Sequence, residues 1–258
     1  MKNIAIITGA SSGLGHEFCH QLDEGHGGPI SEIWAIARNA ERLKELVQTY
    51  TNIKIRPLVL DLTKDESFDE LKALLEEEKP EVEWLINCAG FGTFGSFASV
   101  GDKNSAMVRL NCLALVSAIT CTLPYMSAGS RIINVSSIAG LIPQVQLACY
   151  SATKAFVVEL SRMLDHELKG TGIRVIAICP KFMKTRFLDK PGDTDEASRM
   201  TRIGYNDVEN VAFRALKYAV LGTPVMIPSH DMRLAAFVAK HIPRKALFVF
   251  EDLLFGRN

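Results

Sequence analysis

Short apolar runs alternate with longer amphipathic segments through most of the chain. Runs of about five residues rich in Ile, Val and Leu are typical of strands buried on both faces of a sheet. They occur at 3–7, 33–37, 53–60, 82–86, 131–135, 173–178 and 225–227. Between them, apolar residues recur three and four positions apart, which indicates amphipathic helices. We expect these helices at 14–22, 40–50, 66–79, 104–127, around residue 150, and at 207–220.

The order of these elements predicts a doubly wound α/β fold. Strand–helix–strand units join parallel strands through right-handed crossovers, which place helices on both faces of the sheet. We therefore expect a Rossmann-type sheet of about seven parallel strands in a single domain over 1–258. The polar stretch 181–206 is expected to form a substrate loop or lid, and 229–258 an apolar C-terminal extension.

Charge and cysteine content narrow the classes of function. The chain of 258 residues has 29 basic and 29 acidic residues, so its formal net charge is zero and no footprint for nucleic acid is expected. Its six cysteines are scattered without a Cys-x-x-Cys pair, which argues against a metal site and for thiols in a reducing compartment. Together with an N-terminus unlike a signal peptide, this predicts a cytoplasmic protein. The uncharged stretch 110–130 contains several polar residues, so we expect a core helix there rather than a membrane span.

A glycine-rich turn follows the first strand at once and opens the first helix. Glycines in this place allow a tight turn and a close approach of the backbone, and the helix N-terminus offers free N–H groups to an anion. The turn therefore predicts a phosphate site for a dinucleotide, and a plain turn is the alternative. The residues assigned to it are Gly9, Ser11, Ser12, Gly13, Leu14 and Gly15.

The ends of the next strands supply further candidates for cofactor binding. An acidic residue at the end of the second strand would favour NAD, but Arg38 stands there, so we expect NADP(H) rather than NAD(H). Alternatively, Arg38 only begins the exposed face of a helix. Asp61 and Leu62 follow the third strand, where an adenine would lie, although Asp61 could be a cap. Asn87 ends the fourth strand, and the carboxyl ends of parallel strands share one edge.

Tyr150 and Lys154 are four residues apart on a predicted helix and therefore face the same side. A nearby ammonium favours the phenolate and lowers the pKa of a tyrosine, which would make the pair a general acid/base. Taken alone, the spacing favours an exposed helix face, because Tyr-x-x-x-Lys often arises by chance. Asn111 lies in the uncharged stretch, where a buried amide must find hydrogen-bond partners.

Taken together, these residues resemble the short-chain dehydrogenase/reductase family over about 1–228. The motifs that carry the resemblance keep the family's order, and a serine precedes the tyrosine by thirteen residues. They are Gly9, Gly13, Gly15, Asp61, Asn87, Ala89, Gly90, Asn111, Ser137, Tyr150, Lys154, Pro180 and Thr185.

The resemblance implies a nicotinamide cofactor and interconversion of a carbonyl and an alcohol. By family role, Tyr150 would move the proton and Ser137 would hold the substrate oxygen. Lys154 would bind the ribose and lower the tyrosine pKa, and Asn111 would support a proton relay. Ala89, Gly90, Pro180 and Thr185 would also contact the cofactor. We further expect a homodimer or a homotetramer.

The chain departs from the family pattern at three positions. Cys88 replaces a frequent asparagine, which would loosen a local hydrogen-bond network. Lys181 replaces a glycine after Pro180, and a positive φ would be strained there. Ser12 replaces a basic residue found in many NADP-dependent members, which leaves Arg38 as the main ligand for a 2′-phosphate.

The substrate pocket and the tail are less defined by the sequence. The pocket is expected to be apolar, from residues Phe91, Phe94, Phe97, Leu141, Ile142, Val145 and Leu147. The tail from 229 would pack over the pocket or at a subunit contact, or would lie on a membrane surface. Two other functions stay open: a non-catalytic NADP-binding sensor on the same fold, and a sugar-nucleotide epimerase, which the short chain disfavours.

Overall fold

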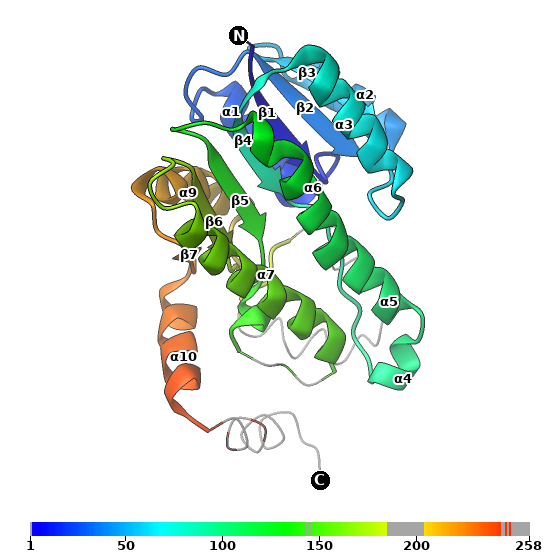
Figure 1. Ribbon diagram of the computed structural model, residues 1–258. Coiled ribbons are helices and arrows are strands. Elements are labelled where there is room, and N and C mark those ends of the chain that lie inside the picture. The colour runs from blue at the N-terminus through cyan, green and yellow to red at the C-terminus, as the bar shows by residue number, and fades with distance from the viewer. Residues whose placement is uncertain are drawn as a thin grey trace.

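The computed structural model describes residues 2–142, 144, 146–184, 204–243, 246 and 248. Its centre is a sheet of seven strands in the order β3-β2-β1-β4-β5-β6-β7, and every pairing is parallel (Figure 1). This confirms the predicted doubly wound sheet. The strands are β1 Asn3–Thr8, β2 Glu32–Ala37, β3 Lys54–Val59, β4 Glu81–Asn87, β5 Arg131–Val135, β6 Arg174–Ile178 and β7 Val225–Met226.

Helices cover both faces of this sheet and enclose two separate cores. On one face, α1, α2 and α9 pack against the strands, and on the other α3, α6 and α7 do so. The inner strands are therefore largely buried on both sides, which is why their sequences are continuous apolar runs, whereas several residues of the edge strand β3 are exposed. The helices on the two faces are α1 Gly13–Asp23, α2 Ala40–Thr49, α9 Val208–Leu221, α3 Glu66–Glu78, α6 Ala114–Thr122 and α7 Ala148–Glu167.

The expected helix over 104–127 is a composite. It consists of α5 Lys103–Val108, a π-helical turn η1 Arg109–Leu113, α6 and a short 3-10 turn η2 Leu123–Tyr125. Lys103–Tyr125 is long and apolar enough to cross a membrane, and α6 packs into the core beside β4 and α3. The stretch before it contains the short helix α4 Phe97–Val100.

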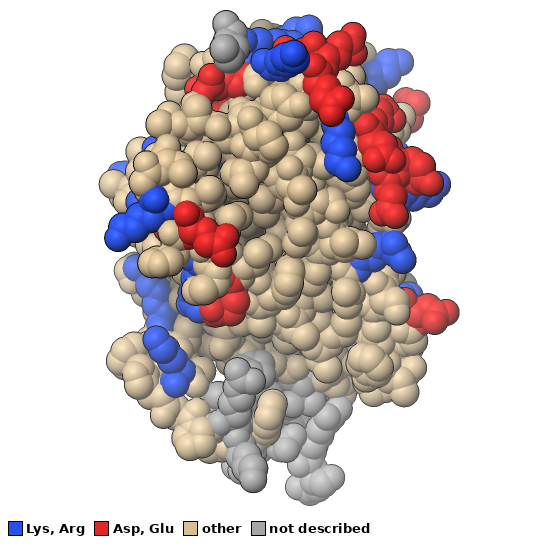
Figure 2. Space-filling view, in the orientation of Figure 1, with Lys and Arg blue, Asp and Glu red and all other residues tan. Residues whose placement is uncertain are grey.

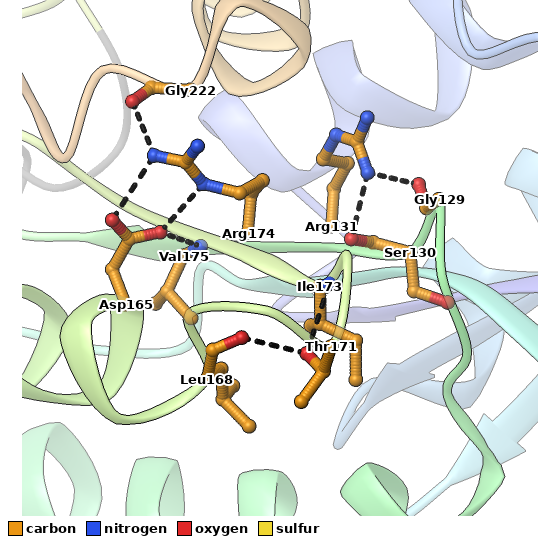
Figure 3. Close-up of polar contacts among 10 residues, drawn as sticks. All are labelled: Gly129, Ser130, Arg131, Asp165, Leu168, Thr171, Ile173, Arg174, Val175 and Gly222. Carbon is orange, nitrogen blue, oxygen red and sulfur yellow. Dashed lines mark hydrogen bonds and ion pairs between the residues drawn. The ribbon is translucent and has the colours of Figure 1, made fainter.

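The far end of α7 is fastened to the sheet by one ion pair (Figure 3). The Arg174 guanidinium donates to both oxygens of Asp165 at 2.9 and 3.1 Å, and the backbone N–H of Val175 donates to the same carboxylate at 2.9 Å. Arg174 also donates to the carbonyl of Gly222, which ends α9. This clasp joins α7, β6 and α9 at the edge of the sheet opposite the glycine turn.

The C-terminal part contains one further described helix. Helix α10, His230–His241, follows β7 and extends away from the sheet (Figure 1). Most of the predicted loop at 181–206 and the end of the predicted extension at 229–258 lie outside the described residues.

Candidate active site

The glycine turn after β1 is built for a close approach of backbone segments. Gly9 and Gly13 have φ values of +70° and +55°, which favour glycine. A Cβ on Gly15 would lie 2.3 Å from the carbonyl oxygen of Gly9, so no side chain fits there. Ser12 is the N-cap of α1, and its side chain makes no capping hydrogen bond. The N-terminal N–H groups of α1 therefore face the turn, as a phosphate site requires.

Thr8 couples this turn to the end of β4. Its hydroxyl oxygen accepts hydrogen bonds from the backbone N–H groups of Cys88 and Ala89, both at 3.1 Å. Asn87 points the other way: its amide donates to the Asn134 side chain at 2.9 Å, inside the sheet. The side-chain oxygen of Asn87 is buried without a hydrogen-bond partner among the described residues, so this network is incomplete beside Cys88.

Two arginines line the cavity at the end where β2 is followed by α2. Arg38 and Arg42 both line it, with Asn39 between them as the N-cap that accepts from the Arg42 N–H at 2.9 Å. Arg42 was not predicted, because Arg38 precedes the helix and the i, i+4 rule for helix faces does not connect the two arginines.

Asp61 does not line the cavity, unlike its neighbours Leu60 and Leu62. Its carboxylate accepts from the backbone N–H and the hydroxyl of Thr63, at 3.1 and 2.7 Å. Burial acts to raise the pKa of Asp61, but these bonds and the charge of Arg38 hold it below its ordinary value. Here the alternative of a capping role describes the side chain better than the expected cofactor contact.

Ser137 and Tyr150 meet at the inner end of the cavity. Ser137 follows β5 as the N-cap of the 3-10 turn η3 Ile138–Gly140, and its hydroxyl oxygen accepts from the Ala139 N–H at 3.2 Å. The same side chain is hydrogen-bonded to the Tyr150 side chain. Tyr150 itself is 8% exposed and lies in the first turn of α7.

Lys154 is held one helical turn further on, against the end of β5. Its ammonium donates to the carbonyl of Val135 at 2.9 Å and lies 5.8 Å from the centre of the Tyr150 ring. The hydroxyl of Ser136 donates to the carbonyl of Lys154 at 2.7 Å. A Cβ on Gly140 would lie 2.6 Å from that carbonyl group, so glycine is what lets η3 and α7 approach.

Burial dominates the protonation of this pair. Desolvation raises the pKa of Tyr150 to about 12, although the Ser137 hydrogen bond acts in the opposite direction. Desolvation also lowers the pKa of Lys154 to about 8. The net shift of the tyrosine is therefore upward, opposite to the expected lowering by Lys154, because both groups lie in a poorly solvated site. At neutral pH the tyrosine keeps its proton.

Asn111 lies behind the cavity, within the π-helical turn, and is 1% exposed. Its side chain brackets Phe91: the amide oxygen accepts from the Phe91 N–H at 3.0 Å, and the amide nitrogen donates to the Phe91 carbonyl at 2.9 Å. The same nitrogen donates to the Thr153 hydroxyl at 3.1 Å. Asn111 thus joins the loop after β4 to α7, and π-turns of this kind are frequent at functional sites.

The other end of the cavity is apolar, as predicted. Phe94 and Phe182 stack with ring centres 6.2 Å apart, and Phe91 and Leu147 lie in the same cluster. The expectation for Phe97 was wrong, because its side chain is 66% exposed on α4. Leu141 and Ile142 are not among the lining residues, and Val145 lies outside the described residues.

The backbone of Lys181 does not adopt a positive φ. Among the described non-glycine residues, only Lys79 and Gln146 have a positive φ. The backbone N–H of Lys181 donates to the Asn206 side chain at 2.9 Å, and its ammonium pairs with Asp231 of α10 at 2.8 Å. The lysine therefore fits without the backbone strain expected of it, and it connects the cavity to α10.

One cavity of about 710 Å³ collects most of the predicted site. Asp61, Asn87 and Asn111 do not line it, and Thr185 lies outside the described residues. Arg42 also lines the cavity and was not predicted, whereas Phe182 and Met183 belong to the expected substrate loop 181–206 and follow the end of β6, where ligands of such sheets bind. The predicted catalytic and cofactor-binding residues that line the cavity are Gly9, Ser11, Ser12, Gly13, Leu14, Gly15, Arg38, Leu62, Ala89, Gly90, Ser137, Tyr150, Lys154 and Pro180.

A glycine-rich turn beside a hydrogen-bonded Ser–Tyr pair and a buried lysine, on a doubly wound sheet, is the arrangement of a nicotinamide-dependent oxidoreductase. The profile of the short chain dehydrogenases matches residues 3–196. The chain belongs to this family.

Its relatives agree with this assignment. An uncharacterized oxidoreductase of Staphylococcus saprophyticus is 30% identical over 83% of this chain and 91% of its own length. Sulfoacetaldehyde reductase 2 of Chromohalobacter salexigens is 30% identical over 77% of this chain and 80% of its own. A short-chain dehydrogenase of Sphingobium yanoikuyae, solved in complex with NADPH, is 25% identical, covers 96% of both chains and superposes with a TM-score of 0.77.

Proposed function

We propose that this chain is an NADP(H)-dependent reductase of apolar ketones or aldehydes. The observation that carries the proposal is the hydrogen-bonded Ser137–Tyr150 pair with Lys154 behind it, in the same cavity as the glycine turn. The close approach of Gly15 and Gly9, which leaves no room for a side chain, supports a diphosphate bound across the turn. When bound, the nicotinamide supplies or accepts the hydride.

The residues of the chain account for the proton. Ser137 lies where its hydroxyl can hydrogen-bond the substrate oxygen and orient it. Tyr150, which keeps its proton at neutral pH, delivers that proton to the carbonyl oxygen as the carbon gains a hydride. The Lys154 ammonium then lies close enough to stabilise the phenolate that is left. A tyrosine that keeps its proton at neutral pH serves as the general acid of carbonyl reduction, and the same residue serves as the base of the reverse reaction.

The preference for NADP(H) rests on Arg38 and Arg42. Two guanidinium groups at the adenosine end suit a 2′-phosphate, because guanidinium binds phosphate through charge-assisted hydrogen bonds. Their position at the end of β2 matches the place where carboxylates select NAD. The NADPH complex of the Sphingobium relative adds support.

A turnover assay with the Tyr150→Phe variant tests the mechanism. Activity with a panel of apolar ketones is followed by NADPH absorbance, and NADPH binding is followed by fluorescence. The variant is expected to bind NADPH but to lose turnover, whereas Tyr125→Phe, a matched change on η2, keeps both. Turnover of Tyr150→Phe at the parent rate would refute the role of Tyr150. A parent protein that binds NADPH and reduces nothing would instead favour the sensor function.

We also propose that the chain forms a homodimer through α5 and α7. Figure 2 shows that the centre of one face, over α6 and α7, is almost uncharged, whereas charged side chains crowd over α2 and α3. Val108, Leu113, Phe156 and Met163 are 42–56% exposed on α5, η1 and α7. Met163→Glu is expected to shift the mass measured by light scattering to that of a monomer. The six unpaired cysteines support a reducing, cytoplasmic location.

A further inference from the structure

Helix α10 turns its large apolar side chains toward solvent and its small ones toward the rest of the protein. Its large apolar side chains point to solvent: Leu234 is 66%, Phe237 64% and Val238 43% exposed. Its alanines at 235, 236 and 239 are half-buried, and Met232 is the one buried residue of the helix. A surface helix of an isolated globular domain turns its large apolar residues inward. We call the outward group Leu234, Phe237 and Val238 the α10 surface.

The α10 surface is a continuous stripe. Leu234, Phe237 and Val238 are three and four residues apart and therefore share one face of the helix. Ile242, directly after the helix, is 37% exposed and continues the stripe, and Phe248 is 45% exposed further along. Such a contiguous exposed apolar surface marks a binding site.

The charge around this surface is basic. The described residues from 229 on contain two Lys or Arg, Arg233 and Lys240, and a single acidic residue, in a chain whose formal net charge is zero. The acidic residue is Asp231, and its carboxylate is paired with Lys181 at 2.8 Å. Lys240 is exposed in the last turn of the helix. The described part of the tail therefore carries two basic residues beside exposed Leu, Phe and Val, and its one carboxylate is already paired.

We propose that the α10 surface binds the surface of an anionic lipid membrane. Large apolar side chains beside basic ones are the pattern of helices that lie in the membrane interface. Helix α10 extends away from the sheet, which leaves this face accessible (Figure 1). A protein partner fits less well, because four or five apolar side chains are few beside the roughly 20–30 residues that each side of a stable protein interface contributes.

Vesicle co-sedimentation of the full chain tests the proposal. Vesicles of phosphatidylcholine mixed with phosphatidylserine are expected to bind the protein, and vesicles of phosphatidylcholine alone to bind it at least about fivefold more weakly, since each basic side chain near an anionic surface contributes about that factor. Added salt should reduce the difference between the two vesicles. Absence of binding to the anionic vesicles would overturn the proposal.

Two double variants distinguish vesicle binding through the α10 surface from nonspecific binding through other exposed apolar side chains. Leu234→Gln with Phe237→Gln is expected to weaken vesicle binding at least about tenfold, because two large apolar side chains are removed. Val220→Gln with Leu221→Gln, which alters equally exposed side chains on α9, should bind like the parent. Equal binding of the α10 variant and the parent would refute the proposal. So would an α10 variant whose oligomer mass without vesicles differs from the parent's, since the surface would then join two copies of the chain.

Ketone reduction in solution makes this test independent of the proposed reductase function. Both double variants leave the cavity residues unchanged and are expected to reduce a soluble ketone at the parent rate. An inactive protein that still binds vesicles would count against the reductase proposal alone.

Discussion

Removing the Asn111 side chain should destabilise the fold more than the size of the change suggests. The side chain is 1% exposed and makes three hydrogen bonds, two to the backbone of Phe91 and one to Thr153, at 2.9–3.1 Å. A buried hydrogen bond contributes about 1 kcal/mol net, and leaving its partner in a dry site adds a desolvation cost. Asn111→Ala should therefore lower the free energy of unfolding by about 3 kcal/mol or more.

A matched control lies on the same composite helix. Asn104 is also buried, at 8% exposure, but its side chain makes one hydrogen bond to the backbone, to the Phe97 carbonyl at 2.9 Å. Asn104→Ala should therefore lower the free energy of unfolding by about 1 kcal/mol. Urea denaturation, extrapolated linearly to water, measures both differences. Equal losses in the two variants, or a loss below that of the control for Asn111→Ala, would refute the idea that bracketing Phe91 stabilises the site.

Three further predictions concern charge and close packing. Lys154→Met should stabilise the fold by about 2–3 kcal/mol at pH 7, because burial lowers the lysine pKa to about 8 from 10.5. The buried charge costs stability below pH 8, and this cost is relieved as pH rises to 10.5, so the gain measured by urea denaturation should disappear above that pH. Arg42→Ala should reduce kcat/KM with NADPH by about 10–100-fold, the cost of a charge-assisted hydrogen bond, and leave NADH unchanged; an equal loss with both cofactors would contradict a 2′-phosphate contact. Gly15→Ala should abolish NADPH binding in fluorescence titrations, because its Cβ would lie 2.3 Å from the Gly9 carbonyl, and parent-like affinity would show that the turn can relax.

The fold was largely predictable because a sheet buried on both faces requires apolar strands. Those runs could be placed to within a residue or two, and the short motifs between them fell at one edge of the sheet. The π-turn around Asn111 was not predictable, because one extra residue in a helical turn leaves the apolar spacing almost unchanged.

The direction of the Tyr150 pKa shift could not be predicted from the spacing of residues along the helix. Four residues of separation place Lys154 beside Tyr150, as expected, but the direction of the tyrosine pKa depends on the packing of η3 and β5 around both groups. The side-chain orientations of Asp61 and Asn87 also depend on their partners. Asp61 accepts from Thr63 within the same turn, and Asn87 donates to Asn134, which is distant in the chain. The sequence therefore predicted the backbone positions of these residues at the strand ends. It did not predict the directions of their side chains.

The Arg174–Asp165 clasp has a geometric consequence for the proton donor. Tyr150 and Asp165 are fifteen residues apart on α7, a lever of about 22 Å at 1.5 Å per residue. A tilt of about 1° at the clasp would move the Tyr150 hydroxyl by about 0.4 Å, close to the roughly 0.5 Å tolerance of catalytic geometry. An ion pair at the far end of α7 therefore contributes to the position of the hydroxyl, together with the packing of α7 against β6 and η3, and substitutions there are expected to alter turnover without changing the cavity residues.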